Sequence, residues 1–268
     1  MKTRVLSGLA MLPLAAIVWI GGWALWIACF ALSVLAVREL FRSFEAADIR
    51  PSRPVAYFSA AALYAVGALA PENLRLCLFW FVLVIFLSFL YLFKTDVRKL
   101  ADGMATLTGI FYVCFFSFHV PLAGQLPQYG LMVWLIFLTA FGTDVMAYFT
   151  GRALGKHKLC PAISPKKTVE GAIGGAAGSV ILCTLFGYFI LPGLLVHCAV
   201  IGLLGGVVSQ LGDLTASVFK RKLGVKDYGT LIPGHGGVLD RIDSVLFTAP
   251  MVYYYAVLVI PIFAPHGA

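Results

Sequence analysis

Charged side chains are scarce in this sequence of 268 residues. Asp, Glu, Lys and Arg make up 12% of it and apolar residues 61%, whereas soluble domains carry roughly 25% charged residues. A soluble fold could not cover so much apolar surface with a polar shell. The scarcity excludes an ordinary soluble enzyme and a disordered chain, and it predicts an all-α polytopic integral membrane protein.

Other features are also missing. The 6 cysteines form no C-x-x-C pair, and five of them lie in or beside apolar segments. This pattern excludes a disulfide-stapled secreted scaffold and favours small core residues over metal ligands. No internal repeat, low-complexity tract or soluble domain is visible. The predicted external loops are very short, so chemistry on a polar substrate has to occur on the cytoplasmic side or within the bundle.

Long apolar runs fill most of the chain. A membrane core of roughly 30 Å needs about 20 apolar residues in a helix. The first two runs are short and join at Gly21-Gly22, which predicts a helical hairpin. The apolar stretch continues to Val37 without a clear small-x-small cleavage site, so an uncleaved first span is expected rather than a removable signal peptide. The sequence predicts about nine spans: Val5–Ile20, Trp23–Val37, Val55–Ala70, Leu74–Phe93, Ala105–Val120, Gly130–Thr150, Val169–Leu191, Leu194–Phe219 and Ser244–Phe263.

Positive charge is distributed unevenly across these spans. With nine spans, all of the 20 Lys and Arg residues except Arg75 fall on the side of the N-terminus. Cytoplasmic loops carry such an excess, so we expect a cytoplasmic N-terminus and an external C-terminus. The net charge of +8 then reflects topology, and no nucleic-acid partner is expected. A bacterial inner (plasma) membrane is the predicted location, with an active site that faces the cytoplasm.

The few acidic residues are unevenly distributed along the chain. Half of its 12 acidic residues lie between positions 144 and 243. We therefore predict an N-terminal transmembrane region of about five spans (1–128), where charges mainly set topology. A catalytic region (129–268) follows, with cytoplasmic loops at 151–168 and 220–243.

Asp144 lies inside an apolar run. An acid at membrane depth costs at least ~2.5 kcal/mol, which marks a functional-site candidate. Tyr148 and Arg152 follow on the same helix face at i+4 and i+8. A purely structural pair with a neighbouring span is the alternative.

The segment from Ser164 to Gly171 reads S-P-K-K-T-V-E-G. Ser164 or Thr168 can cap the next helix. Lys166 and Lys167 stand just before a helix N-terminus, where ammonium groups, unpaired N–H groups and the helix dipole favour a phosphate. A solvated positive-inside loop explains the same residues equally well.

The segment 209–243 is the densest in polar residues. Asp240 and Asp243 share a helix face if the last span begins there, and Asp213 is predicted within span eight. Such oxygen clusters suit Mg²⁺ together with substrate phosphates. The glycines around His235 allow close backbone approach to a ligand. The alternatives are an ion pair between Asp240 and Arg241, a His235 that is merely a loop residue, and a stop-transfer run of cations at 220–222.

This region resembles the phosphatidate cytidylyltransferase (CDP-diacylglycerol synthase) family. Asp144, Ala147, Tyr148, Gly151 and Arg152 match one family segment, and Ser164 to Gly171 match a second, with Val169 where an aromatic residue is common. The resemblance covers residues 144–243, and the N-terminal half is similar only in being polytopic. The signature positions are filled by Ser217, Lys220, Arg221, Lys226, Asp227, Gly229, Ile232, Pro233, Gly234, His235, Gly236, Gly237, Asp240, Arg241, Ile242 and Asp243.

The resemblance implies that CTP and phosphatidic acid give CDP-diacylglycerol and pyrophosphate in phospholipid biosynthesis. It implies Mg²⁺, leaves open a second cation such as K⁺, and is compatible with a homodimer and with a lipid entering from the inner leaflet.

The site residues follow from the same resemblance. We expect Asp213 and Asp240 to be first metal ligands, with Asp243 and Asp144 as second-site or supporting acids. Phosphate contacts are assigned to Lys166, Lys167, Lys220, Arg221 and Lys226, of which Lys226 also counts as catalytic. The nucleotide site is assigned to Ser217, Asp227, His235, Gly236, Gly237 and Arg241.

Two other functions share features of this pattern. An intramembrane prenyltransferase also combines aspartates, Mg²⁺ and a lipid, but it should show two repeated Asp-rich motifs, and none is present. A secondary transporter could use Asp144 and Asp213 as ion relays. It should show inverted repeats, whereas these acids are confined to one half of the chain.

Overall fold

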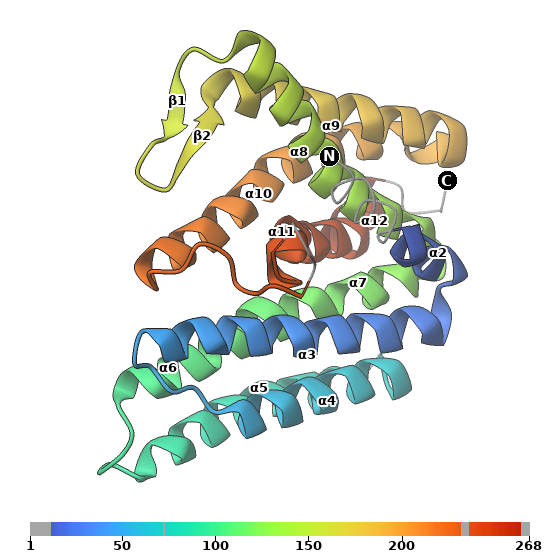
Figure 1. Cartoon of the computed structure of the whole chain (residues 1–268). Helices are drawn as coiled ribbons and strands as arrows, with labels where there is room; N and C mark the ends of the chain where they lie inside the picture. The colour runs from blue at the N-terminus through green and yellow to red at the C-terminus, as the bar shows by residue number, and fades with distance from the viewer. Residues whose placement is uncertain (1–11, 72, 232–235, 264–268) are drawn as a thin grey trace. The chain divides into compact units, whose positions relative to one another are not determined.

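The helices of this chain pack into two compact units (Figure 1). The computed structural model describes residues 12–71, 73–231 and 236–263. Unit 1 combines Met1–Leu122 with Lys220–Ile242, and unit 2 combines Ala123–Phe219 with Asp243–Ala268.

Unit 1 consists mainly of the first helices of the chain. They are α2 (Leu12–Ile20), α3 (Gly22–Ala46), α4 (Arg53–Leu69), α5 (Leu74–Leu90) with the 3-10 turn η1 (Tyr91–Phe93), α6 (Leu100–Gly109), the π-helical segment η2 (Ile110–Phe115) and α7 (Phe116–Gly124). The chain breaks at Gly21-Gly22 as predicted, because α2 ends at Ile20, α3 begins at Gly22, and the two glycines have positive φ values of 64° and 50°. Only glycine adopts such backbone readily. The hairpin of two spans stays a prediction, since the first span begins outside the described residues.

The next helices of unit 1 begin at side-chain caps. Ser52 accepts a hydrogen bond from the Val55 N–H at the start of α4, and Asn73 accepts one from the Leu76 N–H at the start of α5. These bonds satisfy N–H groups that have no partner within a helix.

Helix α3 is longer than predicted. It continues past Val37 to Ala46, because Leu40, Phe41 and Phe44 keep an apolar face buried there. Phe41 packs where Gly109 has no side chain, since a Cβ at Gly109 would lie 2.2 Å from the Phe41 ring. The residues that follow the predicted span two are therefore helical as far as Ala46.

Unit 2 contains the helices of the motif-bearing half. They are η3 (Gly130–Met132), α8 (Val133–Leu154), α9 (Val169–Ile190), η4 (Pro192–Leu194), α10 (Leu195–Lys222), α11 (Leu239–Tyr254), η5 (Tyr255–Val259) and α12 (Ile260–Phe263). Helices α10 and α11 each pass from one unit to the other within their length. Between α8 and α9 lies a hairpin that was not predicted. Its strands β1 (Lys158–Cys160) and β2 (Ser164–Thr168) are antiparallel, with Lys158 opposite Thr168 and Cys160 opposite Ser164.

Glycines allow α8 and α9 to approach closely. A Cβ at Gly175 would lie 2.9 Å from both the Ala147 Cβ and the Thr143 carbonyl oxygen, and one at Gly178 would lie 2.3 Å from Met146. In membranes such small-residue contacts stabilise helix pairs by van der Waals packing. The same helix α8 carries Asp144, so this contact positions the candidate site.

We expect Gly175→Leu to separate α8 from α9. Overpacking a tight contact costs about 1–3 kcal/mol, so the variant should unfold at a lower temperature in detergent than the wild type. Ala177→Leu is the control, because Ala177 lies on the exposed side of the same helix. Equal unfolding temperatures for the two variants would contradict the close packing.

The helices are those of a multi-pass membrane protein. Within the described residues, seven helices are long and apolar enough to cross a membrane by length and composition. Helix α4 has 17 residues, or about 26 Å at 1.5 Å per residue, slightly less than a membrane core. The first predicted span begins outside the described residues. The nine spans and the orientation of the termini therefore remain predictions.

Other boundaries differ from the expected ones. The connection between α10 and α11 covers 223–238, because Lys220–Lys222 continue α10 and Asp240 already lies in α11. The two packing units do not correspond to the predicted division at residue 128. That division separates the motif-bearing half of the sequence from the first half, and it remains a prediction.

Candidate functional site

A cavity of about 390 Å³ in unit 2 brings together residues from three helices and both strands of the hairpin. Helix α8 contributes Asp144, Tyr148 and Arg152, as the i, i+4, i+8 spacing predicted. Arg152 Nη1 lies 3.3 Å from the Tyr148 hydroxyl oxygen and donates to it. Other lining residues come from the hairpin, the start of α9 and α10, namely Leu159, Lys166, Lys167, Thr168, Gly171, Ala172, Gln210 and Asp213.

Asp213 and Lys167 form an ion pair at this cavity. The side chains are each about 25% exposed, but the Lys167 Nζ itself is buried against the carboxylate. Ser217, one turn along α10, donates to the Asp213 Oδ1 over 3.4 Å. The pair joins two motifs that are 46 positions apart in the sequence, so they belong to one site.

The hairpin that carries the lysines is fastened to α9. Thr168 caps α9 by accepting from the Gly171 N–H over 3.1 Å, as one of the two predicted caps. Glu170 accepts hydrogen bonds from the backbone N–H groups of Lys156 (3.0 Å) and His157 (3.2 Å), and its Oε1 lies 2.6 Å from the His157 ring Nδ1. Glu170 therefore anchors the hairpin, a role that the sequence did not reveal.

Oxygen donors at the cavity fit a hard cation. Within the described residues, no group of three or more His, Cys, Asp or Glu side chains could hold a metal ion. However, Asp144 and Asp213 both line the cavity. Mg²⁺ typically takes one or two carboxylates and completes its shell with water and substrate phosphates. These two acids suit that mode of binding.

A second polar cluster lies in unit 1 around Asp240, whose side chain is 4% exposed. Its Oδ1 accepts from Lys220 Nζ over 2.8 Å, and its Oδ2 accepts from the N–H groups of Tyr228 (2.9 Å) and Gly237 (3.0 Å). The ammonium of Lys220 also lies 5.4 Å from the centre of the Tyr228 ring. Asp240 thus pairs with Lys220 and organises the connection between α10 and α11.

Asp240 is less accessible to a metal than Asp213, because its side chain is 4% exposed and that of Asp213 about 25%. Both oxygens of each acid are already engaged, so a metal would have to displace the Lys220 ammonium from Asp240 or the Lys167 ammonium from Asp213. The assignment of Asp240 as a first metal ligand remains a prediction.

Glycine is required beside Asp240. Gly236 has a φ of +84°, and a Cβ there would lie 2.9 Å from the Asp240 Oδ2. Close approach of the backbone to a ligand was expected at this glycine. In the structure the group that approaches it is the Asp240 carboxylate of the same chain.

The remaining predicted residues are spread around these clusters. Asp243 is buried in the first turns of α11, where its Oδ1 accepts from the Ser244 N–H over 2.8 Å. Arg241 is half-buried in the same helix, and Arg221, Lys226 and Asp227 are exposed. His235 lies outside the described residues.

Sequence reasoning missed two further residues. Gln210 lines the unit 2 cavity, and its side-chain nitrogen donates to the carbonyl oxygens of Ala172 (3.1 Å) and Gly206 (2.9 Å). An amide inside an apolar span was the available signal. Glu39 is buried in unit 1, where its carboxylate accepts from the N–H groups of Val238 and Leu239. It lies among charges that were expected mainly to set topology.

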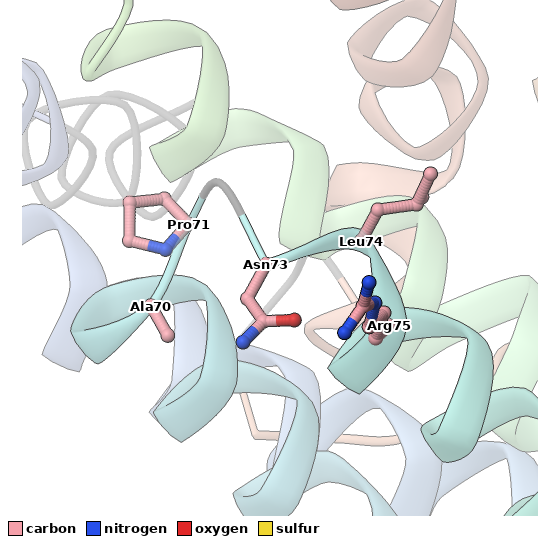
Figure 2. A pocket seen from close by; sticks show the side chains of 5 residues that line it. All are labelled: Ala70, Pro71, Asn73, Leu74 and Arg75. Carbon is pink, nitrogen blue, oxygen red and sulfur yellow. The ribbon is translucent and has the colours of Figure 1, made fainter.

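Another cavity, of about 660 Å³, lies at the turn between α4 and α5 (Figure 2). Its described lining residues are Ala70, Pro71, Asn73, Leu74 and Arg75. None of them is a predicted site residue, and Arg75 is the one cation predicted on the external side. The unit 2 cavity is therefore the better candidate for chemistry.

Comparison with known proteins agrees with the motifs. A phosphatidate cytidylyltransferase of Synechocystis sp. is 35% identical over 288 residues, which cover 97% of this chain and 97% of that protein. One of Staphylococcus haemolyticus is 34% identical and covers 94% of this chain and 97% of its own length. One of Haemophilus influenzae is 44% identical over 135 residues, or 48% of this chain and 47% of that protein.

These matches correct the expected extent of the resemblance. The motifs suggested that only residues 144–243 resemble the family, because the first half lacks recognisable polar patterns. The profile of the cytidylyltransferase family instead matches residues 2–259. The chain therefore belongs to the cytidylyltransferase family of enzymes, and its first helices belong to the family as well as its motifs.

Proposed function

We propose that this chain transfers the cytidylyl group of CTP to phosphatidic acid in the bacterial inner membrane, releasing pyrophosphate on the cytoplasmic side. The observation that carries this proposal is the unit 2 cavity. There the acids Asp144 and Asp213 meet the cations Arg152, Lys166 and Lys167. Carboxylates beside several cations suit a metal–nucleotide phosphate, and the names of the relatives point to these two substrates.

The reaction forms one phosphorus–oxygen bond and breaks another. A phosphate oxygen of phosphatidic acid attacks the α-phosphorus of CTP, and the bond from that phosphorus to the β-phosphate oxygen breaks. The nucleophile is already an anion, so the site needs no strong general base. Its main task is to hold two anionic phosphates together.

The residues divide that task by charge. Asp213 and Asp144 would hold Mg²⁺, which screens the repulsion between the phosphates and stabilises the charge on the leaving pyrophosphate. Lys166, Lys167 and Arg152 would bind phosphate oxygens, because ammonium and guanidinium groups make strong charge-assisted hydrogen bonds. The anchored hairpin keeps the two lysines in place.

Neither alternative function gains support. The relatives reported above are named as cytidylyltransferases, whereas a prenyltransferase or a transporter would be expected to resemble proteins of those kinds.

The test uses the detergent-solubilised protein with radiolabelled CTP, Mg²⁺ and phosphatidic acid. We expect a labelled lipid that comigrates with CDP-diacylglycerol. Diacylglycerol, which lacks the phosphate nucleophile, is the control substrate and should give no such product. Absence of the product at saturating phosphatidic acid would refute the proposal.

Lys167→Ala is expected to raise the KM for CTP or for phosphatidic acid by about tenfold, the effect of losing one charged hydrogen bond. Lys158→Ala is the control, because Lys158 is exposed on the other strand of the hairpin. Unchanged KM values for both substrates in Lys167→Ala would remove Lys167 from the phosphate site.

A further inference from the structure

Glu39 is a buried acid in helix α3 of unit 1, only 6% exposed. A carboxylate buried in this way is costly unless it is fully hydrogen-bonded. Its Oε1 accepts from the Val238 N–H over 3.0 Å, and its Oε2 accepts from the Leu239 N–H over 2.9 Å. Each oxygen of Glu39 thus binds one backbone donor from a segment about 200 residues away.

These two donors form the start of helix α11, which begins at Leu239. The first N–H groups of a helix lack partners within it, and the positive end of the helix dipole favours an anion. Glu39 therefore fixes where α11 begins. Asp240 is the next residue, and it accepts from the Gly237 N–H just before the helix. Two carboxylates, one from α3 and one from α11, thus hold this helix start.

Two glycines make room for Glu39. A Cβ at Gly237 would lie 2.3 Å from the Glu39 Oε2, and a Cβ at Gly229 would lie 2.5 Å from its Oε1. Neither distance is possible for a real side chain without displacing the carboxylate. These glycines fall in the signature segment, and the expected reason for Gly237 was close approach to a substrate. Contact with the Glu39 carboxylate explains the need for glycine there without any substrate.

We propose that Glu39 is a positioning residue for the cytidylyl transfer reaction. By holding the start of α11, it fixes the carboxylate of Asp240 and, through Asp240, the ammonium of Lys220. Glu39 itself touches no substrate. The inference rests on the proposed function, because its effect is read as a rate of cytidylyl transfer.

Glu39→Gln tests this role, because Gln has nearly the same size but offers only one accepting oxygen to the two N–H donors. We expect kcat to fall by about 10- to 100-fold, the range for residues that orient functional ligands. The KM for each substrate should change by less than about threefold, because contacts with substrate remain. Glu45→Gln is the matched control, since Glu45 is exposed on the same helix and its loss should leave kcat unchanged.

The Glu39→Gln result separates this inference from the proposed function. If wild type and Glu45→Gln make CDP-diacylglycerol but Glu39→Gln has a wild-type kcat, only the positioning role is wrong. If neither the wild type nor Glu45→Gln makes CDP-diacylglycerol, the proposed function is wrong instead.

A double-mutant cycle tests the reason for Gly237. Gly237→Ala alone should lower kcat by at least about tenfold, whereas adding it to Glu39→Ala should lower kcat by less than about twofold further, because the clash is then gone. Equal losses in both backgrounds would overturn the inference.

If Glu39→Gln fails to fold, as judged by thermal unfolding and size-exclusion chromatography, the single variant Gly237→Ala decides. A loss of kcat at unchanged KM supports the role, and a wild-type kcat overturns it.

Discussion

Replacing Asp213 by Asn is expected to reduce cytidylyl transfer by at least about 100-fold, the scale on which single charged or donor groups stabilise a transition state. Asn keeps the size of Asp213 but removes the charge that pairs with Lys167 at the unit 2 cavity. It would also neutralise one of the two carboxylates that line this cavity. Asp96→Asn is the control, because it deletes the same charge at an exposed turn.

A second variant separates catalysis from stability for Asp213. If the Asp213–Lys167 pair were only structural, the neutral combination of Asp213→Asn with Lys167→Met should regain activity, since no unpaired charge is left. We expect this double variant to remain inactive while it elutes and unfolds as the wild type does. Recovery of turnover in the double variant would show that the pair only supports the fold.

Replacing Asp240 by Asn is the other large expected effect. Asp240 accepts three hydrogen bonds, from Lys220, the Tyr228 N–H and the Gly237 N–H. An Asn side chain has one accepting oxygen and no charge. Lys220 therefore loses its charged partner, and the hydrogen bonds from the Tyr228 and Gly237 N–H groups are weakened or lost. We expect a loss of at least about 100-fold in kcat, comparable to the loss of a buried charge partner.

Hydrogen exchange tests the structural reason for this effect. The Tyr228 and Gly237 amides should exchange faster in Asp240→Asn than in the wild type. Lys220→Met, which removes only one of the three bonds, should leave these two amides protected and cost less activity. Turnover near the wild-type level in Asp240→Asn would contradict any essential role for this carboxylate, as organiser or as metal ligand.

The sequence predicted those parts of the site that depend on local spacing. The helical period placed Asp144, Tyr148 and Arg152 on one face, and all three line the cavity. Thr168 was one of two expected caps because a short hydroxyl side chain before an apolar helix is a local signal. The helix break at Gly21-Gly22 was predictable for the same reason.

The missed features depend on contacts between distant segments. Glu39 has no local signature, since its partners Val238 and Leu239 lie about 200 residues away. The charges of residues 1–128 were expected mainly to set topology, and nothing local sets Glu39 apart from them. The β1–β2 hairpin lacks an alternating apolar pattern, and the hydrogen bonds that fasten it join Glu170 to Lys156 and His157, 14 and 13 positions away. Helix α3 exceeded its predicted end because burial of Phe41 and Phe44 outweighed the local charges.

The most direct measurement follows the α-phosphorus of CTP. The purified protein is incubated with Mg²⁺, phosphatidic acid and CTP labelled at the α-phosphorus, and the lipid and aqueous phases are separated. Wild type and Asp96→Asn should transfer the label to the lipid phase as CDP-diacylglycerol, in step with pyrophosphate release, whereas Asp213→Asn should not. A label that stays in water-soluble nucleotide with the wild-type protein, or that reaches the lipid equally well with Asp213→Asn, would contradict the account.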